Sequence, residues 1–165
     1  MTQITLPKRR RVRPVTNKSM PHAQIGVDPS PEILKTLFHR CYSLPNVKNR
    51  PTVMSVPGAR ALWLAEGVEL AHPEAIVRGR EFAHIHPDGS LHVALPPERA
   101  AEAITTGWAE LHPLAQMMAN VGMVLLYTPQ DQDELEVIVR LVVDSYNFVT
   151  GRREQVSVGA RKVNS

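Results

Sequence analysis

The chain has 165 residues, of which 43% are hydrophobic, enough for one domain with a buried core and too few for two domains of ordinary size. Its single cysteine, Cys41, excludes an internal disulfide, and the first thirty residues lack the apolar core of a signal peptide. The longest apolar runs, such as 122–127, are far shorter than the roughly 20 residues that cross a bilayer. These features favour a cytoplasmic location and predict no membrane span.

Charge is divided unevenly along the chain, whose formal net charge is +3. Residues 1–25 hold six basic side chains and no acid, whereas residues 26–151 hold nine basic and fifteen acidic side chains, a net of −6. A nucleic-acid groove needs clustered positive charge on the folded surface, so the body is not expected to bind nucleic acid. We interpret residues 1–25 as a flexible basic arm, 26–151 as the single folded domain and 152–165 as a C-terminal tail.

Helix and strand signals begin after the basic arm. Pro31 opens a run of apolar residues at helical spacing, which predicts a first helix near 31–43. The short runs 52–56 and 60–65, separated by Pro57-Gly58, predict two paired strands. Residues 66–80 show no clear pattern, and a hairpin follows them.

The second half of the chain alternates helix and strand. Residues 97–106 predict a helix that Gly107 closes, and the apolar run 123–127 predicts a buried strand. The sequence 128–131 predicts the start of a last helix that ends at Gly151. This order predicts an α+β fold, with a single antiparallel sheet, helices packed mainly on one face, and the other face partly open.

The hairpin is centred on Pro87-Asp88-Gly89, which predicts a three-residue loop because proline presets a type I turn and glycine enters the left-handed region freely. This loop sets His84 opposite His92 and His86 opposite Ser90. A two-residue loop would mix polar and apolar residues on each face, so the three-residue loop is favoured. The favoured register gives an apolar face of Ala83, Ile85, Leu91, Val93 and Leu95, and a second face of Phe82, His84, His86, Ser90, His92 and Ala94.

Three histidines on one face of a hairpin can converge on one metal ion. Three imidazoles with an open position suit catalytic zinc, and also copper, iron or nickel. The sequence therefore predicts metal ligands at His84, His86 and His92, with His112 as a candidate fourth ligand. Ordinary hydrogen bonding, general acid/base chemistry, anion binding and a pH-sensitive surface remain alternatives. Arg60 and Trp108 are candidate residues for binding a small-molecule ligand.

Residues 79–92, GREFAHIHPDGSLH, resemble the signature of small bacterial and fungal luciferase-domain proteins, a family without an assigned function. Further matches bring the resemblance to about 20–151; they are Pro21-His22-Ala23-Gln24, residues 56–63, Gly107-Trp108 with His112-Pro113, and residues 127–151. The resemblance favours a bacterial source and transfers little chemistry. Outside this resemblance, His22 is expected to lie beyond the folded body. The order of elements is also similar to that of MmcQ/YjbR-type domains, a topological likeness only.

Two functions follow from these observations. The first is a metal- or small-ligand-binding domain built on the histidine face, with enzymatic activity left open. The alternative is a non-catalytic interaction module whose basic arm binds nucleic acid or an acidic partner. A luciferase-like oxygenase is a third option that depends on the family name alone.

Overall fold

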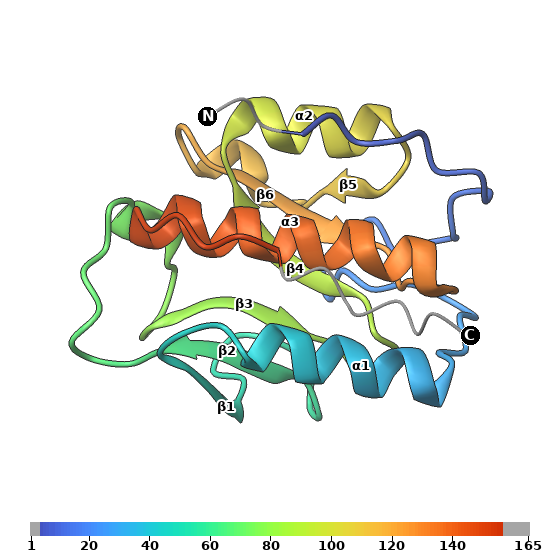
Figure 1. Ribbon diagram of the computed structural model, residues 1–165. Helices are drawn as coiled ribbons and strands as arrows, with labels where there is room; N and C mark the ends of the chain where they lie inside the picture. Colours follow the sequence, from blue (N-terminus) through green and yellow to red (C-terminus); the bar gives the residue numbers. More distant parts are fainter. Residues whose placement is uncertain (1–3, 157–165) are drawn as a thin grey trace.

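A computed structural model of the chain describes residues 4–156. It contains one six-stranded antiparallel sheet in the order β1-β2-β3-β4-β6-β5 and three α-helices (Figure 1). This confirms the predicted α+β class. The strands are β1 Val47–Pro51, β2 Arg60–Leu64, β3 Glu81–Ile85, β4 Leu91–Leu95, β5 Ala109–Leu111 and β6 Gly122–Leu126. The helices are α1 Pro31–Tyr42, α2 Pro97–Thr105 and α3 Gln132–Thr150, and the short 3-10 helices are η1 Pro73–Ala75 and η2 Ala115–Met117.

Helix α3 is the main support of the sheet. It contacts β3, β4 and α1, while α2 contacts β5 and β6. The N-cap Asp131 accepts a hydrogen bond from the Glu134 N–H at 2.8 Å, and Gly151 ends the helix in the left-handed conformation with φ 73. The predicted apolar face is fully buried and consists of Leu135, Ile138, Leu141, Val142, Tyr146 and Val149. The core therefore lies between this helix and the sheet.

Two strands differ from the prediction. Residues 52–56 do not form a strand, and β2 pairs instead with β1, through contacts such as Lys48↔Trp63. β1 lies at the edge of the sheet and is exposed along most of its length, so it carries no apolar alternation by which to recognise it. The three-residue β5 is equally hard to recognise from sequence, for lack of length.

Residues 4–25 are packed on the domain instead of extending from it as a flexible arm. The buried Leu6 donates its N–H to Glu102 Oε1 at 2.7 Å, and Arg9 donates its N–H to the Thr106 carbonyl at 2.8 Å. Arg11 forms ion pairs with Asp131 and Glu134. The excess positive charge of this segment is thus matched by acidic residues of the body.

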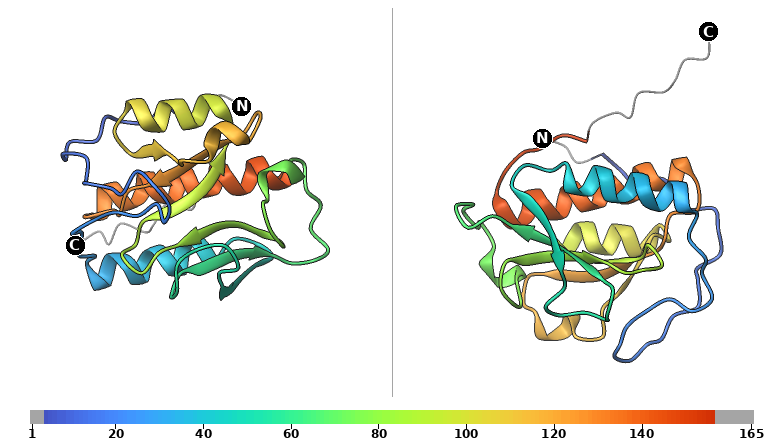
Figure 2. Two further views of the ribbon diagram at one scale, coloured as in Figure 1. Left: turned by 180° about the vertical axis from the view of Figure 1, so that it is seen from behind. Right: turned by 90° about the horizontal axis from the view of Figure 1, so that it is seen from below.

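Residues 15–25, here called the N-terminal hairpin, fold back on themselves. The Asn17 N–H donates to the Ala23 carbonyl at 2.8 Å and the Ile25 N–H to the Val15 carbonyl at 2.9 Å. Figure 2 shows this hairpin on the side of the sheet opposite α1 and α3. It thereby covers part of the face that the sequence predicts to be open. Within residues 4–156, none of the helices combines the length and hydrophobicity needed to cross a membrane.

Candidate metal centre

The register of the β3–β4 hairpin is the predicted one. His84 lies opposite His92, and the His86 N–H donates to the Ser90 carbonyl at 2.8 Å. Gly89 adopts the left-handed conformation, with φ 87, that closes the three-residue loop. The local sequence alone therefore fixes the positions of three histidines.

A β-bulge changes the residues at the far end of the same face. The pairing of β2 with β3 shifts between Leu62 and Trp63, so that Trp63 lies opposite Glu81. Glu81 then lies beside His84, whereas Phe82 makes an edge contact with Tyr146 of α3. The prediction that Phe82 lies on the histidine face is wrong because strict alternation does not continue through a bulge.

The histidines of this face are buried: His84, His86 and His92 are 6%, 4% and 6% exposed. His22, at the end of the N-terminal hairpin, is 3% exposed and its ring stacks on that of His92 at a centroid distance of 5.2 Å. The prediction that His22 lies outside the folded body is therefore wrong. The sequence did carry a signal for its position, since a segment of +6 and a body of −6 are electrically complementary.

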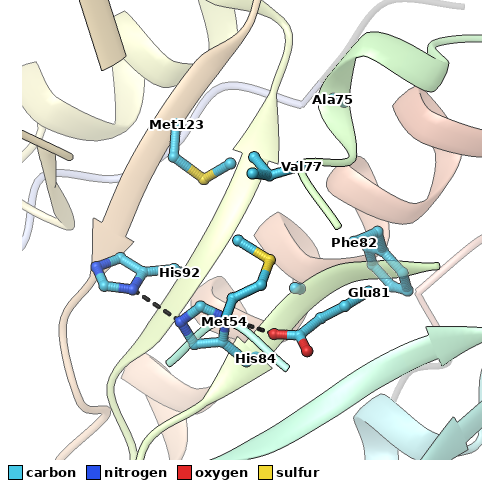
Figure 3. Close-up of a pocket in the computed structure, with 9 residues that line it drawn as sticks. Met54, Ala75, Val77, Glu81, Phe82, His84, His92 and Met123 are labelled. Carbon is cyan, nitrogen blue, oxygen red and sulfur yellow. Dashed lines mark hydrogen bonds and ion pairs between the residues drawn. The ribbon is translucent and has the colours of Figure 1, made fainter. Parts of the chain in front are cut away.

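The buried polar groups form one continuous chain across the sheet. His84 Nδ1 lies 3.0 Å from Glu81 Oε2, and His84 Nε2 lies 2.9 Å from His92 Nδ1 (Figure 3). On the other side, His92 Nε2 lies 3.2 Å from His22 Nδ1, and His22 Nε2 lies 2.9 Å from Glu110 Oε2. Three imidazoles thus connect two carboxylates, and both nitrogens of each imidazole are engaged.

Both terminal carboxylates are held in the ionised form. Glu81 accepts hydrogen bonds from Thr52 Oγ1 at 2.8 Å and the Val53 N–H at 2.9 Å. Burial raises the pKa of Glu81, but these bonds and the one from His84 outweigh it and leave the pKa below its usual value. The pKa of Glu110 is lowered in the same way, against the effect of burial, by hydrogen bonds led by His22 and Lys18. Each carboxylate therefore accepts a hydrogen bond from the N–H of its histidine partner.

His86 lies beside this series of hydrogen-bonded side chains, and its own hydrogen bonds define its tautomer. Ser90 Oγ lies 2.6 Å from Asp88 Oδ1 and 2.8 Å from His86 Nδ1. The serine hydroxyl proton is donated to the Asp88 carboxylate, so Ser90 Oγ accepts the Nδ1–H of His86. This leaves the Nε2 lone pair of His86 without a proton.

The predicted fourth ligand, His112, has a different arrangement. Its Nδ1 accepts the Leu114 N–H at 3.0 Å, and its ring lies 4.8 Å from that of His92. Burial and the neighbouring histidines lower the pKa of His112 to about 4. The neutral ring therefore carries its proton on Nε2 and has no free lone pair. We leave His112 out of the ligand set proposed below.

The imidazole contacts of His92 depend on the protons that its two neighbours carry. Burial and the neighbouring histidines lower the pKa of His92, so this ring is neutral and has one N–H. When His84 and His22 each carry one proton, His84 donates it to Glu81 and His22 donates it to Glu110. His92 then faces two lone pairs with one proton, and one of its two contacts joins two unprotonated nitrogens. Either a cation beside that contact or a second proton on His84 or His22 removes the repulsion.

Two groups of residues have ligand nitrogens within 4.8 Å of one another and could hold such a cation. One is His84, His86 and His92, and the other is His22, His92 and His112. If His92 carries its proton on Nε2 and donates it to His22, the first group offers three free lone pairs. The opposite tautomer gives the second group only two, because the His112 lone pair is already used. The hydrogen-bond pattern thus favours His84, His86 and His92 of the β3–β4 hairpin as the metal ligands.

A small cavity of ≈ 20 Å³ opens beside these rings, with room for about one water molecule. Figure 3 shows Met54, Val77 and Met123 around it, with His84 and His92 at its side. The lining away from the histidines is mainly apolar. A small ligand on the outer side of the histidines would therefore meet thioether and aliphatic groups.

The two candidate ligand-binding residues lie away from this cavity. Arg60 donates to Asn49 Oδ1 at 2.7 Å between β2 and β1. Trp108 is buried in the hydrophobic core, and its indole N–H donates to the Pro7 carbonyl at 2.7 Å. Neither lines the cavity beside the histidines, and their role in ligand binding stays a prediction.

Comparison with known proteins gives one family. Residues 79–145 match the Luciferase domain. Luciferase of Armillaria gallica is 28% identical over 165 residues, which cover 88% of this chain and 61% of that protein. Luciferase of Armillaria ostoyae is 27% identical over the same shares. Luciferase of Neonothopanus nambi is 33% identical over 104 residues, covering 56% of this chain and 39% of that protein.

The chain spans 61% of the length of the two Armillaria proteins described first. These relatives are fungal, so the expected bacterial source has no support. No solved structure matches the chain, and the topological likeness to MmcQ/YjbR-type domains stays a prediction. The matched segment contains Glu81, the three hairpin histidines and Glu110, whereas His22 lies before it. Residues 79–145 thus match the luciferase-domain family model, and 88% of the chain is similar to the luciferase of Armillaria gallica.

Proposed function

We propose that this protein binds one divalent transition-metal ion through His84 Nε2, His86 Nε2 and His92 Nδ1. The observation that carries the proposal is the convergence of three buried imidazoles, with His84 Nε2 2.9 Å from His92 Nδ1 and a ligand nitrogen of His86 within 4.8 Å of both rings' ligand nitrogens. Ligand nitrogens about 2.0 Å from a tetrahedral zinc ion lie about 3.3 Å apart. Metal binding would therefore require the two nitrogens to separate by about 0.4 Å, the difference between this spacing and their present distance of 2.9 Å.

The surroundings of the three rings support the same ligand set. Metal-bound histidines usually donate their second N–H to a carboxylate or another acceptor, which fixes the ring and raises its basicity. His84 has Glu81 in this position, and His86 has Ser90, which is itself bonded to Asp88. Burial and the neighbouring His84 lower the pKa of His86 to about 4, which keeps its lone pair available at neutral pH.

Three neutral imidazoles are ligands that zinc, copper, iron and nickel all accept. A metal held by three imidazoles keeps an open coordination position, where it can polarise a bound water or substrate oxygen. We propose that this position faces the cavity lined by Met54 and Met123, so that a small ligand reaches the metal from there. A luciferase-like oxygenase activity depends on the name of the relatives alone, and the metal site is the function proposed.

Elemental analysis of tag-free protein purified without chelator tests the proposal. We expect about one metal ion per chain, the stoichiometry of a single three-histidine site. His86→Ala should remove the metal, while His39→Ala, at an exposed position of α1, should retain it. Circular dichroism of both variants controls for folding. Wild-type protein that is folded, metal-free and unable to take up zinc, copper, iron or nickel would overturn the proposal.

The alternative function, binding of nucleic acid or an acidic partner by the basic N-terminal segment, receives less support. Most of the basic side chains there hold groups of the same chain, which leaves few for a partner. Arg9 lies 3.7 Å from Glu134, Arg11 pairs with Asp131 and Glu134, Arg13 donates to the Ala109 carbonyl at 3.0 Å, and Lys18 pairs with Glu110 at 2.9 Å.

A further inference from the structure

His22 lies outside the segment that matches the luciferase-domain family, yet its side chain is fully buried against that segment. It reaches the histidine cluster from the N-terminal hairpin and contacts His92 on the nitrogen that the proposed metal site does not use. The tautomer of His92 depends on whether His22 Nδ1 donates a hydrogen bond to His92 Nε2 or accepts one from it.

Glu110 fixes the direction of every hydrogen bond on this side of the cluster. It accepts from Thr16 Oγ1 at 2.8 Å, from Lys18 Nζ at 2.9 Å and from Tyr127 Oη at 3.1 Å. A carboxylate with these donors, one of them a lysine, acts only as an acceptor. The neutral form of His22 therefore places its proton on Nε2, 2.9 Å from Glu110 Oε2, and its Nδ1 becomes an acceptor.

Hydrogen bonds anchor the N-terminal hairpin to the domain and so keep His22 in position between Glu110 and His92. Gln24 accepts the Thr128 N–H at 3.0 Å and donates to Thr128 Oγ1 at 2.7 Å and to Asp88 Oδ2 at 3.2 Å. Thr16 and Lys18 tie the other strand of the hairpin to Glu110. His22 is thus fixed between two anchored strands.

We infer that His22 and Glu110 are positioning residues that hold His92 as its Nε2–H tautomer and so free His92 Nδ1 for the metal. The inference rests on the proposed metal site and extends it to the N-terminal hairpin. Without the acceptor on His22, the proton of His92 is free to move to Nδ1 and bond with His84 Nε2. That exchange would use up two of the three lone pairs offered to the metal.

A packing role for His22 is the competing explanation, since its ring also stacks on His92. Three substitutions separate packing from polarity. His22→Gln keeps both an acceptor for His92 and a donor for Glu110, His22→Leu keeps most of the volume without either, and His22→Lys offers donors only. Polarity predicts that the glutamine variant retains metal affinity, the leucine variant loses roughly 10- to 100-fold, and the lysine variant loses more.

The test measures metal affinity by competition with a zinc-binding indicator, using zinc alone as the probe. His72→Leu is the control, because His72 also pairs with a carboxylate, Glu74, but its side chain is 43% exposed. It should leave zinc affinity unchanged. Thermal unfolding of the zinc-free variants shows that each one is folded. A leucine variant that binds zinc as tightly as wild type would overturn the inference while leaving the metal site intact.

A second readout does not depend on metal. Long-range ¹H–¹⁵N NMR spectra of the zinc-free protein distinguish the two tautomers of a histidine ring. We expect His92 to be the Nε2–H tautomer in wild type and in His22→Gln, and to shift toward Nδ1–H in His22→Lys. An Nδ1–H tautomer in wild type would overturn the inference. The expected tautomer in a protein that binds no metal would uphold the positioning and overturn the proposed function.

Discussion

The two faces of the β3–β4 hairpin are buried to the same extent but by different means. Ile85, Leu91 and Val93 are fully buried on strands that contact α3, and His84 and His92 are 6% exposed on the opposite face. The first face is stabilised by the removal of apolar area from water, which needs no particular partner. The second face is stable only if each polar group finds a partner of opposite polarity.

This comparison explains why the polar face, and not the apolar one, indicates function. On the apolar face, packing accounts for every side chain. On the polar face, hydrogen bonds account for Glu81 and Glu110, but three neutral imidazoles have too few protons for the contacts that His92 makes with His84 and His22. A buried polar group without a hydrogen-bond partner is rare in folded proteins, and such a group among histidines indicates a ligand-binding role.

The largest effect should come from the apolar face. Leu91→Ala removes a fully buried side chain and should lower the free energy of unfolding by roughly 2–5 kcal/mol. Urea unfolding measures the loss, and Leu114→Ala, at a side chain 44% exposed, should cost far less. Because Leu91 points away from the histidines, folded Leu91→Ala should keep its metal. Loss of metal from the folded variant would show that the two faces are not independent.

A change of pH should act mainly on the polar face. The pKa of His86 is about 4 in the folded protein and about 6.5 when unfolded, so the unfolded chain binds a proton that the folded one does not. Stability present at pH 7 is therefore lost as the pH falls, by about 2 kcal/mol at pH 5 for this group. Urea unfolding in the presence of a chelator measures this loss. His86→Gln should reduce it, and an equal pH dependence in that variant would contradict the assignment.

The smallest effect should come from a single outer hydrogen bond of the polar face. Tyr127→Phe removes the hydroxyl that donates to Glu110, which keeps its bonds from Thr16, Lys18 and His22. We expect the free energy of unfolding to fall by about 1 kcal/mol and the metal content to stay unchanged. A loss as large as that of Leu91→Ala would mean that the polar face contributes to stability as a cooperative unit.

Local signals predicted the part of the site that lies on one hairpin. The turn at Pro87-Asp88-Gly89 sets the register, and the register brings His84 and His92 together without any long-range information. Glu81 was missed because a bulge interrupts the alternation of β3. His22 and Glu110 were missed because they are 88 residues apart in sequence and meet only in the fold.

The same distinction applies to the fold. The helices carry caps and an apolar periodicity that mark their own limits, as Asp131 and Gly151 do for α3. β1 shows no alternation of polar and apolar residues, because an edge strand exposed to water needs no apolar face. The charge imbalance between residues 1–25 and 26–151 was visible, but it could equally indicate an external partner. Only the contacts of Arg11 and Lys18 show that the acidic partner is the same chain.

The most direct test of the metal site is an anomalous-difference map from crystals grown without chelator or soaked in zinc. We predict one peak about 2.0–2.1 Å from His84 Nε2, His86 Nε2 and His92 Nδ1, the usual Zn–N distance. A peak bounded instead by His22, His92 and His112, or no peak after soaking at neutral pH, would contradict the account.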